Sequence, residues 1–238
     1  MVKTARRVSR KVVFRLMELY ARRTSPSTET DPFHELSRRF FREAAELRPC
    51  RILELGSRVL PNGLGSKKAC FARYDEYVGF DIHPGDEVDV VGDIHQLSTH
   101  LPADHFTAVF SVSVFEHLAM PWKAVLEINR VMAVGGLMMI QTHPAWPAHE
   151  LPWDFWRYQQ SSFKALLNRF TGFEIVACSE GLPCRILPLG AEGSMRGLMN
   201  QPASLGITVL ARKISPPSDR VRWDVATSEI TDDLYPRS

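Results

Sequence analysis

The sequence predicts an α/β fold with a mostly parallel β-sheet. Between residues 51 and 142, short apolar segments of strand length alternate with segments of helical periodicity. Acids stand at or just after the ends of three strand-like segments, at Glu54, Asp81 and Asp93. Sheets of this kind bind ligands at the carboxyl ends of their strands. The 238 residues, 45% of them hydrophobic, suit one α/β domain with extensions.

A basic amphipathic helix is expected over residues 8–20. Its apolar stripe comprises Val8, Val12, Val13, Leu16, Met17 and Tyr20. Residues 1–23 hold eight Lys or Arg and one acid. We expect the stripe to pack on the domain. The alternatives are a surface for an anionic membrane or an acidic partner protein, or an organelle transit peptide.

A second helix is expected after a linker at residues 25–30. Asp31 would cap its N-terminus, with Pro32 in the first turn. Its apolar face comprises Phe33, Leu36, Phe40, Ala44 and Leu47. The expected organisation is a helical extension (residues 1–48), a main domain (49–213) and a loose tail (214–238).

The first strand is expected at residues 51–55, an apolar run typical of a strand covered on both faces. Glu54 lies within it, and a carboxylate there is costly unless it accepts hydrogen bonds. Gly56 ends the strand, where the backbone must turn sharply or approach a ligand. A turn at residues 61–63 and a short helix at 66–74 should follow.

The second and third strands are expected at residues 77–81 and 88–91. Asp81 ends the former, where a carboxylate can accept from the vicinal hydroxyls of a ribose; the alternative is a carboxylate that caps the next loop. The intervening residues are too few for the usual crossover helix, so an extended loop is predicted. Asp93 is expected to cap a helix at residues 94–100.

The fourth and fifth strands are expected at residues 107–112 and 137–142, with a helix from Pro121 between them. Residues 143–158 then hold three of the five tryptophans and two histidines. Three prolines stiffen this segment. We expect a substrate wall and lid formed by Trp153, Asp154, Trp156 and Arg157. The alternative is a structural cap, in which Asp154 and Arg157 form a buried pair.

A further helix is expected after this loop, capped by Ser161 or Ser162. Its core face would comprise Phe163, Leu166, Leu167 and Phe170.

The composition excludes several classes of function. The net charge of +2 does not call for a polyanionic partner, so we expect no nucleic-acid binding. Four scattered cysteines without a C-x-x-C pair indicate reduced thiols in a cytoplasmic protein. The histidines and acids lack a chelating spacing, so no metal site is expected. No apolar run approaches the ~20 residues of a membrane span.

Five ordered segments together resemble the class I S-adenosylmethionine (SAM) dependent methyltransferases, and within them the type 11 family. They are E-L-G at 54–56, G-F-D at 79–81, G-D at 92–93, E-H at 116–117 and G-G at 135–136. The run E-L-G-S-R is similar to that of one bacterial subgroup. The resemblance implies a Rossmann-like seven-stranded sheet, closed by an antiparallel hairpin with strands at residues 174–178 and 207–211.

The resemblance also implies that SAM is the cofactor. Its binding residues would be Glu54, Gly56, Ser57, Arg58, Asp81, Ile82, Asp93, Ile94, Ser111 and Val112. Asp93 would face the adenine amino group. The sequence departs from the family's run of three glycines, because Arg58 and Leu60 stand at the second and third positions.

Methyl transfer needs an aligned nucleophile, and a hydroxyl nucleophile gains from a base, most naturally histidine. The candidates are His143 and His149, followed by His117; each could equally be structural. The predicted function is methyl transfer to a small polar acceptor, such as a hydroxyl of a sugar, glycoconjugate or secondary metabolite. The alternatives are a non-catalytic partner protein of the same fold and an N-methyltransferase. An NAD-dependent oxidoreductase is disfavoured because G-x-G-x-x-G is absent.

Overall fold

A computed structural model describes five stretches of the chain, residues 10–24, 30–60, 65–188, 197–198 and 201–221. The linker at 25–29, the turn expected at 61–63 and the tail beyond 221 lie outside the described residues. No helix within the described stretches has both the length and the apolar character required to cross a membrane.

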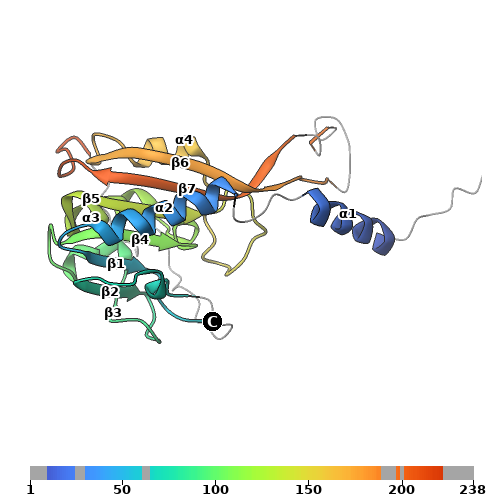
Figure 1. The fold of residues 1–238 in the computed structure, drawn as a ribbon. Coiled ribbons are helices and arrows are strands. Elements are labelled where there is room, and N and C mark those ends of the chain that lie inside the picture. Colours follow the sequence, from blue (N-terminus) through green and yellow to red (C-terminus); the bar gives the residue numbers. More distant parts are fainter. Residues whose placement is uncertain (1–9, 25–29, 61–64, 189–196, 199–200, 222–238) are drawn as a thin grey trace, which may run out of the picture.

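A seven-stranded sheet forms the centre of the molecule, in the order β3-β2-β1-β4-β5-β7-β6 (Figure 1). The strands are β1 (Arg51–Leu55), β2 (Glu76–Asp81), β3 (Val90–Val91), β4 (Phe106–Val112), β5 (Met132–Thr142), β6 (Phe173–Cys184) and β7 (Ala203–Lys213). The first five strands run parallel, and β7 runs antiparallel to both β5 and β6. The predicted Rossmann-like sheet and its closing hairpin are confirmed.

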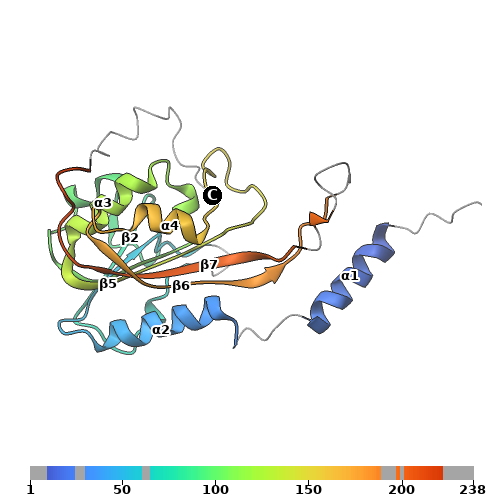
Figure 2. The ribbon, with the colours of Figure 1, turned by 90° about the horizontal axis from the view of Figure 1, so that it is seen from above.

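The last three strands are longer than the sequence pattern predicts. β5 begins at Met132, directly after the preceding helix, and the β6–β7 hairpin extends to Cys184 and Ala203. The far end of this hairpin reaches beyond the rest of the sheet (Figures 1 and 2). Its side chains there are mostly half-buried or exposed. They therefore lack the strong apolar alternation by which a strand is recognised in sequence.

Helices cover both faces of the sheet, as Figure 2 shows. α2 (Pro32–Glu46) lies on one face, where Phe40 and Ala44 pack with Phe110 of β4. α3 (Pro121–Val131) and α4 (Gln160–Leu166) lie on the other face. The Asp31 carboxylate accepts from the backbone N–H of Phe33 at 3.0 Å, which confirms the predicted cap of α2.

The connections near the candidate site differ in part from the prediction. No helix is found in residues 82–89 between β2 and β3, as expected. The helix expected at residues 66–74 is reduced to a single 3₁₀ turn, Lys68–Cys70. The reason is that Ser66 and Lys67 donate hydrogen bonds to Glu54 in β1, which holds this segment against the strand.

α4 also begins and ends differently from the prediction. Its N-cap is Gln159, and Ser162 occupies the third helical position, where its hydroxyl accepts from the Gln159 N–H at 3.1 Å. The helix ends at Leu166, so Phe170 lies beyond it and is half-exposed. Asn168 causes this early end, because its side chain accepts from the backbone N–H of Phe170.

α1 (Arg10–Thr24) forms close to the predicted position but does not pack on the sheet. Six of its apolar side chains are exposed, among them Leu16 at 61% and Tyr20 at 70%. In both views it stands apart from the body, beyond the end of the β6–β7 hairpin (Figures 1 and 2). The expectation of a helix capping the domain is therefore wrong.

Candidate active site

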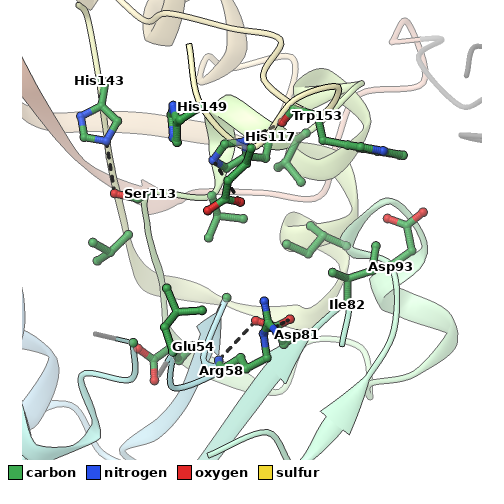
Figure 3. A pocket seen from close by; sticks show the side chains of 18 of the residues that line it. Glu54, Arg58, Asp81, Ile82, Asp93, Ser113, His117, His143, His149 and Trp153 are labelled. Carbon is green, nitrogen blue, oxygen red and sulfur yellow. Dashed lines mark hydrogen bonds and ion pairs between the residues drawn. The ribbon is translucent and has the colours of Figure 1, made fainter. Parts of the chain in front are cut away.

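A cavity of about 470 Å³ lies at the carboxyl ends of the parallel strands. One side is lined by Glu54 of β1, Arg58 from the turn after it, and Asp81 at the end of β2 (Figure 3). The opposite side carries histidines at positions 117, 143 and 149, from the segments after β4 and β5. The site therefore has one acidic wall with an arginine and one imidazole wall.

Gly56 turns the chain at the base of the cavity. Its φ is +80°, and its N–H donates to the carbonyl of Phe80 at 2.8 Å. A Cβ at this position would lie 2.3 Å from Cγ2 of Val114, another lining residue. Glycine is therefore required by both the backbone conformation and the contact with Val114.

Glu54 uses both carboxylate oxygens to shape the wall. Oε2 accepts from the hydroxyls of Ser66 and Tyr77, each at 2.6 Å, and Oε1 accepts from the N–H of Lys67 at 2.7 Å. Burial raises the pKa of Glu54, and these hydrogen bonds oppose that rise. Glu54 thereby positions Gly65 and Lys67, which also line the cavity.

The acid at the end of β2 and the acid after β3 are likewise held by backbone donors. Asp81 accepts from the N–H of Arg58 at 3.2 Å and from that of His83 at 3.0 Å. Asp93 accepts from the N–H of His95 at 2.9 Å and caps the 3₁₀ helix Ile94–Thr99. The expected capping roles are therefore present, and both residues also line the cavity.

Most of the predicted cofactor residues line the cavity, whereas two do not. The lining includes Glu54, Gly56, Arg58, Asp81, Ile82, Asp93, Ile94 and Val112. Ser57 and Ser111 are absent from it, because both are buried beneath the surface. Ser57 packs under the backbone of Gly79, where an added Cβ would come within 2.6 Å of the Ser57 Oγ.

His143 directly follows β5 and faces the cavity. Its Nδ1 lies 3.0 Å from the carbonyl oxygen of Leu205. Since a carbonyl can only accept, Nδ1 carries the proton and Nε2 is the basic nitrogen of the neutral ring. Nε2 lies 3.3 Å from the hydroxyl of Ser113 and 3.3 Å from Oε1 of Glu116.

Glu116 is a buried carboxylate behind the imidazole wall, which the sequence analysis included in the E-H segment but did not predict as a site residue. It is fully buried, and its Oε2 accepts from the hydroxyl of Thr142 at 2.6 Å. Its Oε1 has no hydrogen-bond partner among the described residues. The sequence does carry one signal for Glu116: an acid stands within the mostly apolar run at residues 114–120. If such a run is buried, its carboxylate needs a polar partner.

His117 and His149 complete the wall. Nδ1 of His117 lies 2.5 Å from the carbonyl oxygen of Trp153, and Nδ1 of His149 lies 3.2 Å from that of Pro147. The two rings meet edge to face, with centroids 4.7 Å apart. Glu116, His117 and His149 each offer one ligand atom within 4.8 Å of the others. The structure thus gathers all three predicted histidines, together with one acid.

The aromatic loop lines the cavity with residues other than most of those predicted for the substrate wall. Trp153 lines it, but Asp154, Trp156 and Arg157 do not. Arg157 donates to both oxygens of Asp154, at 2.5 and 2.7 Å, and the Asp154 side chain is only 2% exposed. Trp156 donates to the carbonyl of Leu118 at 2.8 Å. These three side chains hold the loop in place, which corresponds to the structural alternative.

The chain resembles a known family of protein domains over about a third of its length. Residues 62–140 match the methyltransferase domain of type 11, a match that begins after β1 and its turn. None of the curated proteins matches the chain in sequence.

Solved structures share the fold at low sequence identity. The YcgJ protein from Bacillus subtilis aligns with a TM-score of 0.55 at 18% identity, covering 76% of this chain and 100% of its own. A SAM-dependent methyltransferase from Archaeoglobus fulgidus aligns with a TM-score of 0.53 at 16% identity, covering 83% and 99%. At these identities the likeness establishes the fold.

Proposed function

We propose that this chain, a class I SAM-dependent methyltransferase with a type 11 domain, methylates a hydroxyl of a small polar acceptor. The acceptor class is a sugar, glycoconjugate or hydroxylated secondary metabolite. One observation carries the proposal: a basic imidazole nitrogen, Nε2 of His143, faces the strand-end acids across one cavity.

The acidic wall fits the cofactor. Asp81 stands at the end of β2, where a carboxylate can accept from both ribose hydroxyls. Ile82 and Ile94 supply apolar surface for the adenine ring of SAM, beside Asp93. Arg58 offers a guanidinium on the same wall for the carboxylate of the methionine part. Bound SAM supplies a methyl group that its positively charged sulfur has already activated.

The chain itself must remove a proton from the acceptor hydroxyl. His143 would accept it at Nε2, since the Leu205 carbonyl holds the N–H on Nδ1. The imidazolium that results would lie 3.3 Å from Oε1 of Glu116, whose negative charge stabilises it. His149 and His117 are the alternative bases. His143 is preferred because a hydroxyl, that of Ser113, already lies within reach of its basic nitrogen.

The test measures release of S-adenosylhomocysteine with a panel of hydroxylated acceptors and a matched panel of amines. His143→Gln should lower kcat by about 100-fold or more, the contribution of a general base, and leave SAM affinity unchanged. His105→Gln is the matched control, because His105 pairs with Glu76 at the start of β4, outside the cavity. Full turnover in His143→Gln would remove the base assignment.

The alternative functions give different results in the same assay. A non-catalytic partner protein of this fold, suggested by the glycine-poor turn after β1, would bind SAM without turnover of any acceptor. Methylation confined to the amine panel would indicate N-methyl transfer.

We also propose that α1 contacts an anionic membrane surface or an acidic partner protein. Its apolar residues Phe14, Leu16 and Leu19 are exposed, together with Arg15 and Arg23. An exposed apolar stripe beside basic side chains is typical of helices that lie on anionic lipid. The four cysteines are free, which supports a cytoplasmic location.

A further inference from the structure

Three metal-ligating side chains meet on the imidazole wall of the cavity. Glu116 and His117 come from the segment after β4, and His149 comes from the loop after β5. Each contributes one nitrogen or oxygen donor, and the three donors lie within 4.8 Å of one another. Tetrahedral ligand atoms at about 2.0–2.1 Å from zinc are about 3.3 Å apart. Small side-chain rotations would therefore bring these three donor atoms to the spacing that zinc needs.

The buried carboxylate supplies a second, independent observation. Glu116 is fully buried, and only one of its oxygens is hydrogen-bonded, to the hydroxyl of Thr142. The other oxygen, Oε1, has no hydrogen-bond partner in the described part of the chain. Nε2 of His143 lies 3.3 Å from it, but in the neutral ring this nitrogen carries no proton to donate. A buried carboxylate oxygen is costly unless a proton donor or a cation satisfies it.

The two histidines are oriented as metal ligands usually are. In His117 and His149, Nδ1 faces a backbone carbonyl, that of Trp153 and that of Pro147 respectively. Such partners fix the ring and leave Nε2 as the ligating nitrogen. The Asp154 carboxylate lies 3.4 Å from Nδ1 of His149 and is a second acceptor beside that nitrogen.

We infer that Glu116, His117 and His149 form a binding site for one divalent transition-metal cation, such as Zn²⁺. Two imidazoles and one carboxylate suit zinc and its neighbours, whereas Mg²⁺ and Ca²⁺ prefer oxygen ligands. Three protein ligands leave a coordination position open, and His117 and His149 both line the cavity. The site therefore faces the space in which an acceptor would bind.

The cation would act on the acceptor oxygen. This step alone rests on the proposed methyl transfer. A hydroxyl that coordinates the metal has a lower pKa, so it loses its proton more readily to a neighbouring base. An acceptor with a metal-coordinating hydroxyl, such as one of a vicinal pair, would be favoured over an isolated hydroxyl.

The experiment titrates the chelator-treated full chain with Zn²⁺ by calorimetry. We expect one Zn²⁺ per chain and a rise in the melting temperature on binding. His149→Gln should weaken Zn²⁺ binding by about 100-fold or more, since loss of even a supporting partner costs 10–100-fold. Glu116→Gln should do the same. His105→Gln should bind as the wild type does, and Mg²⁺ at equal concentration should not compete.

The site is rejected if the wild-type chain takes up no stoichiometric Zn²⁺, if folded His149→Gln binds it as tightly, or if Mg²⁺ competes. Should Glu116→Gln not fold, His149→Gln decides alone, because its side chain is partly exposed. A parallel titration with SAM keeps the two proposals apart, since failure to bind SAM counts only against methyl transfer.

Discussion

Replacing Asp154 with Asn tests the role of the aromatic loop most directly. The carboxylate of Asp154 receives two hydrogen bonds from Arg157 and one from the N–H of His149. Chiefly because of the Arg157 hydrogen bonds, the pKa of Asp154 is lowered to about 2. Compared with an ordinary aspartate, that pKa corresponds to about 2.5 kcal/mol of folding free energy. Arg157 is 26% exposed, and solvent screening reduces the expected contribution to about 1–2 kcal/mol.

The sign of the pH dependence follows from the lowered pKa. The unfolded chain binds this proton at higher pH than the folded chain does, so the stabilisation is complete above about pH 5. It is lost progressively as the pH falls toward 2, where the folded carboxyl also becomes protonated. Asp154→Asn should therefore lower the free energy of unfolding at pH 7, and the difference from the wild type should shrink below pH 4.

The assay is urea unfolding of both proteins at pH 7, 4 and 3, with thermal melting at pH 7. A loss of 1–2 kcal/mol corresponds to about 2–8 °C in Tm for a chain of this size. Glu35→Gln is the matched control, because Glu35 pairs with Arg38 at an exposed position and should change stability little. Unchanged stability in Asp154→Asn, with a raised acceptor KM, would refute the structural role and restore Asp154 as a substrate ligand.

Three further perturbations test other parts of the structure. Asp81→Ala should weaken SAM binding by about 1–3 kcal/mol, the range for a hydrogen bond to a charged group. An unchanged SAM affinity, measured by calorimetry, would remove the ribose assignment. Gly56→Ala should lower Tm, because the positive φ and the 2.3 Å contact with Val114 both oppose a Cβ; an unaltered Tm contradicts this. Deletion of residues 1–23 should leave Tm unchanged, since the large apolar side chains described in α1 are exposed, but abolish sedimentation with phosphatidylserine vesicles. A fall in Tm would count against a helix that does not pack on the domain. Undiminished sedimentation would count against its contact with the membrane.

The five parallel strands could be located along the chain from sequence because their signals are local, whereas the closing hairpin was expected only from the family resemblance. Leu53 and Leu55 mark β1, and Asp81 marks the end of β2, within a few residues of chain. The missing helix between β2 and β3 followed from chain length alone. The far half of the β6–β7 hairpin gave no such signal, since its side chains do not pack into the core.

The candidate site was only partly predictable, because its chemistry depends on contacts between distant segments. Glu116 acquires its role from Thr142 and His143, both at the end of β5, and no spacing along the chain reveals that contact. The same holds for the approach of His149 to His117. Asp154 and Arg157 were recognised as a candidate pair, but only burial decides between holding the loop and binding a substrate.

The glycine-poor turn after β1 shows how a departure from a family pattern can be accommodated. Arg58 and Leu60 stand at the positions where the resembling family has glycines, and glycines of the facing segments lie close to Arg58. A Cβ on Gly85, in the β2–β3 loop, would lie 2.7 Å from Cγ of Arg58, and one on Gly65 would lie 2.5 Å from its carbonyl oxygen. Gly65 also has a φ of +144°, which favours glycine. Two glycines thus lie close around Arg58, whose side chain lines the cavity wall.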